Sequence, residues 1–124
     1  LSEVHRRNLS IMMIHDPARI DALALEIQSV NAPRTRVLSP EHALSDKLEQ
    51  VLRRTPARFH SFWGERCIFE PDLARRRELL RSIQAQSAFH IVPGAGHWVQ
   101  YEAADECNRL LLDVLMNPDA GPRL

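Results

Sequence analysis

The sequence predicts an α/β protein in which two parallel strands with flanking helices are preceded by further helices. Apolar residues recur at helical spacing before residue 56, and two short apolar segments follow, at residues 57–63 and 88–92. A helical pattern comes after each of these segments, and an order of strand, helix, strand, helix is typical of a parallel sheet. We therefore divide the chain into a helical segment, residues 1–55, and a βαβα unit, residues 56–124.

The helical segment contains three expected helices. The first covers residues 2–14 and ends before Pro17, because the residue preceding a proline disfavours helical dihedrals. Asp16 is a suitable N-cap for the second helix, with Pro17 at its first position. The apolar side of this helix follows the spacing i, i+3, i+4, i+7 and consists of Ile20, Leu23, Ala24 and Ile27. The third helix is expected over residues 40–54, after Ser39 as its cap.

The βαβα unit begins with the strand 57–63, which ends at Gly64. A helix over residues 71–85 leads to the strand 88–92, and a last helix is expected over residues 102–116, with Leu111 and Leu115 among its inward-facing side chains. Parallel strands are normally buried on both faces and flanked by other strands. The sequence thus calls for a broader sheet than it contains. We expect the chain to be part of a longer protein, or to need a second copy of itself.

The composition excludes several function classes. The 124 residues include sixteen basic and sixteen acidic ones, so the chain lacks the positive charge of a nucleic-acid-binding protein. No apolar segment of about 18 residues is present, so we expect no membrane span. Cys67 and Cys107 have neither metal-ligand nor disulfide-framework spacing, which favours reduced thiols in a cytoplasmic protein without metal or cofactor. The strong preference for Arg over Lys is interpreted as a bacterial coding bias.

A histidine after a glycine-rich turn is the main candidate for chemistry. The strand 88–92 is followed by Pro93-Gly94-Ala95-Gly96 and then by His97. Open α/β sheets bind ligands at the carboxyl ends of their strands. A histidine there suits general-base work, because its unperturbed pKa lies near neutrality. A loop histidine without catalytic function is the alternative from spacing alone.

Two segments together resemble the last third of the α/β-hydrolases. They are Phe62-Trp63-Gly64-Glu65 and Ile91-Val92-Pro93-Gly94-Ala95-Gly96-His97-Trp98, separated by a helix. The resemblance implies that residues 1–55 are the end of a helical cap and that residues 56–124 belong to the hydrolase core. It also implies that His97 is the general base of a Ser-His-acid mechanism. The serine of such enzymes lies in a G-x-S-x-G turn, which this sequence does not contain. We therefore expect the nucleophile upstream, and this chain alone to be inactive.

The position of the triad acid departs from the family pattern. The resemblance places an aspartate three residues after Gly64, where this sequence has Cys67. A thiol lacks the fixed negative charge that stabilises a protonated imidazole, unless its pKa is strongly lowered. Glu65, Glu70 and Asp72 are possible substitutes, and an acid from an upstream strand is another alternative. The sequence leaves this choice open.

The remaining expectations concern substrate and partners. Trp98 resembles a substrate-pocket aromatic residue of carbon–carbon bond hydrolases, and Met12 and Arg36, with Asn8 and Met13, are candidates for the cap side of the pocket; helix packing is the alternative for each. We expect a small ester or carbonyl substrate cleaved by esterase, lactonase or carbon–carbon hydrolase chemistry, while dehalogenases and cofactor-free haloperoxidases share the layout. The alternative function is a non-catalytic remnant or interaction module of the same fold.

Overall fold

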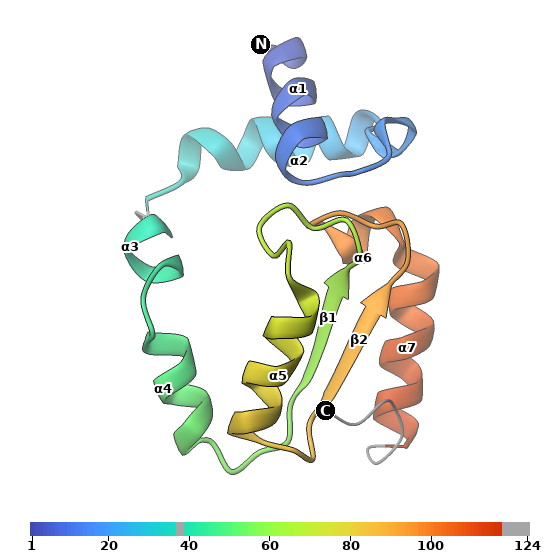
Figure 1. Ribbon diagram of the computed structural model, residues 1–124. Coiled ribbons are helices and arrows are strands. Elements are labelled where there is room, and N and C mark those ends of the chain that lie inside the picture. Colours follow the sequence, from blue (N-terminus) through green and yellow to red (C-terminus); the bar gives the residue numbers. More distant parts are fainter. Residues whose placement is uncertain (37–38, 118–124) are drawn as a thin grey trace.

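The computed structural model describes residues 1–36 and 39–117, and it is an α/β structure (Figure 1). Within this described part, the sheet consists of two parallel strands, β1 (His60–Gly64) and β2 (Ala88–Val92), with His60 opposite Ala88 and Gly64 opposite Val92. The bounds of β2 are those expected from the sequence. β1 begins later than residue 57, because the N–H of Phe59 donates to the Ser87 hydroxyl at 3.1 Å instead of joining a strand ladder.

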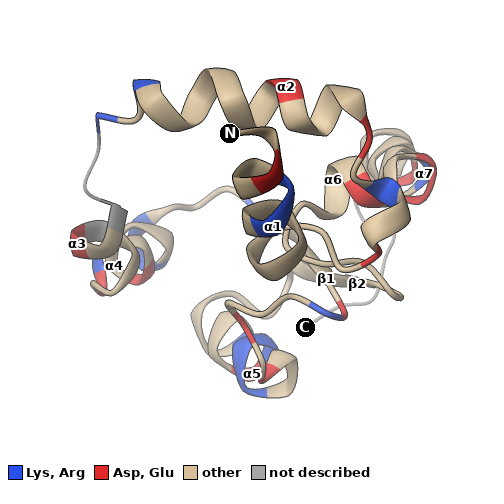
Figure 2. Cartoon of the chain, turned by 90° about the horizontal axis from the view of Figure 1, so that it is seen from above, with Lys and Arg blue, Asp and Glu red and all other residues tan. Residues whose placement is uncertain are grey.

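Two helices cover opposite faces of this sheet. α5 (Leu73–Ile83) places the guanidinium groups of Arg76 and Arg77 over the rings of Trp63 and Phe89, at 5.5 and 5.3 Å. On the other face, Cys107 of α7 (Ala104–Met116) packs in a buried cluster with Val92. Side chains alternate between the faces of a strand, so neighbouring residues of β2 reach different helices. Figure 2 shows α5 and α7 on the two sides of the strands.

The N-terminal helices lie above the carboxyl ends of the strands (Figure 1). α1 (Ser2–Met12) and α2 (Ala22–Asn31) enclose a buried cluster of Leu9, Ile14, Ile20 and Ala24. The expected start of the second helix at Asp16 is wrong. Asp16 caps only a short 3-10 turn, Pro17–Arg19, and the side chain of Asp21 caps α2 by accepting from the N–H of Ala24 at 2.9 Å. A second 3-10 turn, Ala32–Arg34, follows α2.

The expected single helix over residues 40–54 is also wrong, because the chain forms two helices there. They are α3 (Ser39–Ala43) and α4 (Lys47–Arg54), and α4 lies against α5. The interruption falls at Asp46, which takes the N-cap position of α4, where the first intrahelical bond runs from the N–H of Gln50 to the Asp46 carbonyl. Asp favours caps over helix interiors because its side chain competes for backbone hydrogen bonds.

The last expected helix, over residues 102–116, corresponds to α7, which begins at Ala104 and ends at Met116, and a short separate helix precedes it. α6 (Val99–Glu102) ends at Ala103, whose non-helical backbone, φ −126° and ψ 50°, separates it from α7. The final residues of the predicted hydrolase core segment, 118–124, lie outside the described residues. Among the residues that the structure describes, no helix has the length and apolar character needed to cross a membrane.

Several apolar side chains of the outer helices are exposed. The expectation that Leu111 and Leu115 face inward is wrong: they are 46% and 66% exposed. A two-stranded sheet is narrow, so only part of the apolar surface of α7 lies over it. On α4, Leu48 and Val51 are exposed as well. These helices present more apolar surface than the described sheet covers.

Candidate functional site

The loops that follow the two strands are joined by backbone hydrogen bonds. The N–H of Glu65 donates to the carbonyl of Val92 at 3.0 Å, and the N–H of Arg66 donates to that of Ala95 at 2.8 Å. The Glu65 carboxylate accepts from the N–H of Gly94 at 2.9 Å. Because the strands are parallel and in register, both loops leave the same edge of the sheet. The loop after β1 therefore lies directly against the loop after β2.

Glycines make this close approach possible. A Cβ atom at Gly64 would lie 2.0 Å from the carbonyl oxygen of Gly96, and one at Gly96 would lie 2.8 Å from the backbone nitrogen of His15. Both neighbours are backbone atoms, which cannot rotate away as a side chain does. Gly94 has a φ of +70°, a left-handed conformation that favours glycine. The glycine-rich turn is thus required by the contact between three backbone segments.

His97 lies on the loop between β2 and α6, as the sequence predicts for a residue at the carboxyl end of a strand. Its Nδ1 is 3.3 Å from the sulfur of Cys67, on the loop after β1. The ring of Phe69 meets the His97 ring edge-on, with 4.7 Å between the ring centres. Within residues 1–36 and 39–117, Nε2 of His97 has no hydrogen-bond partner. The structure therefore brings His97 and Cys67 together and leaves the other ring nitrogen available.

The local environment favours the neutral form of His97. Partial burial lowers the pKa of this imidazole below its ordinary value of 6.5, although the side chain as a whole remains exposed. Cys67 is 5% exposed, so its thiol is almost fully covered. Either the thiol donates to Nδ1 or Nδ1–H donates to the sulfur, depending on the tautomer. In the second arrangement, Nε2 carries a lone pair that can accept a proton.

The candidate substitute acids do not contact His97. Glu65 binds the Gly94 N–H, and Glu70 forms an ion pair with Arg76. Asp72 caps α5 by accepting from the N–H of Arg75 at 2.8 Å. Each of these carboxylates has another partner, so the described residues place only the Cys67 thiol beside Nδ1.

The candidate substrate residues are dispersed. Met12 lines a cleft of about 30 Å³ beside His97, together with Met13, His15, Arg66 and Ile68 among others. Trp98 packs instead against the buried cluster of α1 and α2 and against Tyr101, at 5.9 Å between ring centres. Arg36 is exposed and does not line this cleft. Of the five candidate substrate residues, Met12 and Met13 line the cleft beside His97, whereas Asn8, Arg36 and Trp98 do not.

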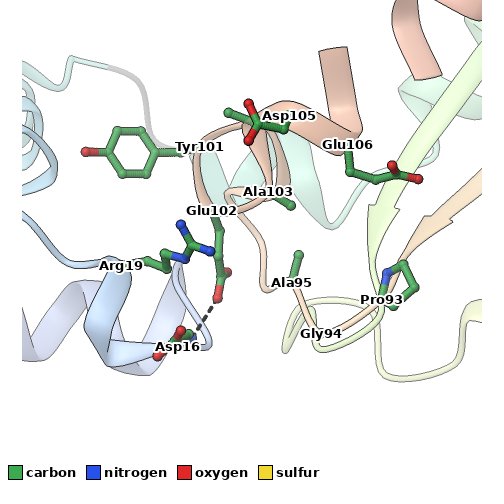
Figure 3. A pocket seen from close by; sticks show the side chains of 11 residues that line it. Asp16, Arg19, Pro93, Gly94, Ala95, Tyr101, Glu102, Ala103, Asp105 and Glu106 are labelled. Carbon is green, nitrogen blue, oxygen red and sulfur yellow. Dashed lines mark hydrogen bonds between the residues drawn. The ribbon is translucent and has the colours of Figure 1, made fainter. Parts of the chain in front are cut away.

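Glu102 is a buried residue of this region that sequence reasoning did not single out. Its Oε2 accepts from the N–H groups of Gly96 at 2.6 Å and His15 at 3.0 Å, and Oε1 accepts from the N–H of Asp16 at 2.6 Å. Figure 3 shows Glu102 pointing toward Asp16, with Arg19 beside it, at the wall of a cavity of about 360 Å³. One carboxylate therefore connects the N-terminal segment to the loop that carries His97.

No protein-family model matches this chain, and no curated protein sequence matches it significantly. The described residues also contain no group of three or more His, Cys, Asp or Glu side chains arranged to hold a metal ion. The contact between His97 and Cys67 is thus the main chemical feature of this site.

Proposed function

We propose that this chain is the C-terminal part of an α/β-hydrolase-type enzyme that cleaves a small ester or carbonyl substrate, with His97 as general base. The observation that carries the proposal is the placement of His97 after β2, with Nδ1 3.3 Å from Cys67 on the loop after the neighbouring parallel strand. A Ser-His-acid mechanism needs one ring nitrogen held by a partner and the other directed to the nucleophile. The unpartnered Nε2 fits that requirement.

In this mechanism, the nucleophile is a serine outside this chain. Nε2 of His97 accepts the proton of the serine hydroxyl while the serine oxygen attacks the carbonyl carbon of the substrate. Nε2 then returns the proton to the leaving group, and an acyl-enzyme forms. Water releases the acyl group by the same proton transfers. The protonated imidazole that forms in each half-reaction is the species that a neighbouring anion would stabilise.

Cys67 makes this proposed enzyme slow. A neutral thiol stabilises the imidazolium far less than a carboxylate, and replacing the acid of a Ser-His-Asp triad with a neutral group reduces turnover by about 10⁴.

The N-terminal helices fit the position of a cap, because α1 and α2 lie over the carboxyl ends of the strands (Figure 1) and Met12 borders the cleft beside His97.

The test is to co-express the chain with the polypeptide encoded immediately upstream and to isolate the complex. We expect hydrolysis of a short-chain p-nitrophenyl ester and labelling of the upstream serine by a fluorophosphonate. His97→Ala should abolish both, whereas His15→Ala, which changes another histidine of the same cleft, should retain most of the activity. Activity that survives His97→Ala would refute the role of His97.

A second function, a non-catalytic module of the same fold, is favoured by one observation: the residue beside Nδ1 is a thiol and not a carboxylate. Cys67→Asp in the same complex separates the two functions. The hydrolase predicts an increase in turnover of tenfold or more, since the carboxylate restores a stabilising charge. A stable complex that binds no fluorophosphonate, with or without Cys67→Asp, would support the non-catalytic module.

A further inference from the structure

In the described part of the chain, the residue beside Nδ1 of His97 is a thiol, and three carboxylates of this region have other partners. The Cys67 sulfur is 3.3 Å from Nδ1, while Glu65, Glu70 and Glu102 are bound to other groups. Among the described residues that line the cleft beside His97, the other charged or titratable ones are Arg66, 3.6 Å from the Glu65 carboxylate, and His15. Any negative charge created on the sulfur would therefore act on the His97 ring first.

We propose that Cys67 is an oxidative modification site, whose oxidation by a peroxide to the sulfinate supplies the anion that His97 otherwise lacks. Transfer of the thiol proton to Nδ1 gives a thiolate, which attacks one oxygen of hydrogen peroxide. The O–O bond breaks, a sulfenic acid forms, and the departing hydroxide takes the proton back from Nδ1 as water. A second peroxide molecule oxidises the sulfenic acid to the sulfinic acid and is reduced to a second water. The sulfinic acid ionises at neutral pH.

The two cysteines differ in what their thiols contact. Cys107 donates to the carbonyl of Val99 at 3.3 Å, and burial together with the neighbouring Glu106 raises the pKa of its thiol. A carbonyl cannot take the thiol proton, whereas Nδ1 of His97 can. Because the thiolate is the species that reacts with peroxide, Cys67 has the proton acceptor that Cys107 lacks.

A small cleft reaches the loop that carries Cys67. Its neighbours in sequence, Arg66 and Ile68, line the cleft of about 30 Å³ beside His97. A cavity of about 10–15 Å³ holds one water molecule, so this cleft is large enough for a molecule of the size of hydrogen peroxide. Ile68 and Phe69, which follow Cys67 in the chain, are more than half exposed, whereas Cys67 itself is 5% exposed.

Oxidation changes the electrostatics of His97 in a defined direction. An anion within about 4–6 Å stabilises the protonated imidazole and raises its pKa by about 1–3 units. The functional consequence, a more effective general base, rests on the hydrolase role proposed above. The oxidation and the pKa change rest only on the Cys67–His97 contact, so they can be measured without substrate or nucleophile.

The experiment uses the 124-residue chain with Cys107→Ser, which leaves Cys67, and the matched variant Cys67→Ser, which leaves Cys107. Each is treated with hydrogen peroxide, followed by intact mass and peptide mapping, and the His97 ring is titrated by NMR. We expect the first variant to gain two oxygens at Cys67 at least tenfold faster than the second does at Cys107. The pKa of His97 should rise by at least one unit on oxidation, and Cys67→Asp should raise it without peroxide.

Equal oxidation rates at the two cysteines, or a disulfide-linked dimer as the main product, would overturn the proposal. So would a sulfinate at Cys67 that leaves the His97 titration unchanged. A failure of ester hydrolysis in the co-expressed complex would instead count against the hydrolase function alone, because the peroxide experiment measures no turnover.

Discussion

Replacing Glu102 should detach the N-terminal segment from the His97 loop. Its carboxylate accepts three backbone N–H groups, and the residue is 7% exposed. Glu102→Ala leaves the buried N–H of Gly96 without a partner, which costs about 1–3 kcal/mol, while the bonds to His15 and Asp16 contribute about 0.5–1.5 kcal/mol each. We expect the free energy of unfolding to fall by about 3 kcal/mol. Glu102→Gln, which keeps one acceptor oxygen, should cost about half as much.

Urea denaturation followed by circular dichroism measures the change in stability, and hydrogen exchange locates it. The backbone amides of His15, Asp16 and Gly96 should lose protection in Glu102→Ala, while the amides of β2 should lose protection only through the global change. Glu106→Gln is the matched control. Glu106 lies on the surface of α7 and pairs with Arg109 of the same helix, so its replacement should leave these three amides unaffected.

Two results would contradict this role of Glu102. If Glu102→Ala unfolds at the urea concentration of the unmodified chain, the three hydrogen bonds contribute no net stability. If stability falls but the amides of His15 and Asp16 exchange at unchanged rates, the carboxylate stabilises α7 or α6 and does not connect the N-terminal segment to the loop.

Three further predictions follow from the geometry. Burial, and secondarily the nearby His60, lowers the pKa of His90, so the unfolded chain binds a proton at a higher pH than the folded chain does. The free energy of unfolding should therefore decrease as the pH falls below about 6.5 toward the lower pKa of the folded state. Thermal melts of His90→Gln should show a weaker decrease. Gly64→Ala should cost at least about 2 kcal/mol in urea unfolding because its Cβ meets backbone, whereas Gly94→Ala, with open space around its Cβ, should cost only about 1 kcal/mol from its positive φ. The exposed leucines of α4 and α7 should cause self-association, and light scattering that finds a cooperatively melting monomer would contradict this.

Elements with local signals were predictable from the sequence. β2 has its expected bounds because its five residues are mostly apolar or aromatic and are followed by Pro93 and Gly94, which typically end a strand. The placement of His97 followed from the same turn. The proximity of Cys67 to His97 was implied by the resemblance to the α/β-hydrolases, and the structure explains it, since the two parallel strands are neighbours and their carboxyl ends meet at one edge of the sheet.

Features that depend on distant residues were not predictable. Two of the three donors to Glu102, His15 and Asp16, precede it by more than eighty residues, so no local pattern identifies them. The break within residues 40–54 had a local signal in Asp46, but apolar periodicity continues across it and favoured one helix. The inward orientation expected of Leu111 failed for another reason: periodicity identifies an apolar side of a helix but not the width of the surface that covers it.

The fold determines where the partner of His97 lies, and residue 67 determines what that partner does. The loops after β1 and β2 are held together by backbone hydrogen bonds and by the contact of Gly64 with Gly96, none of which involves the Cys67 side chain. A change of chemistry at residue 67, by substitution or by oxidation, therefore leaves these contacts intact. It follows that the charge beside Nδ1 can be altered while the position of the imidazole is kept, and the titration of His97 reports that charge directly.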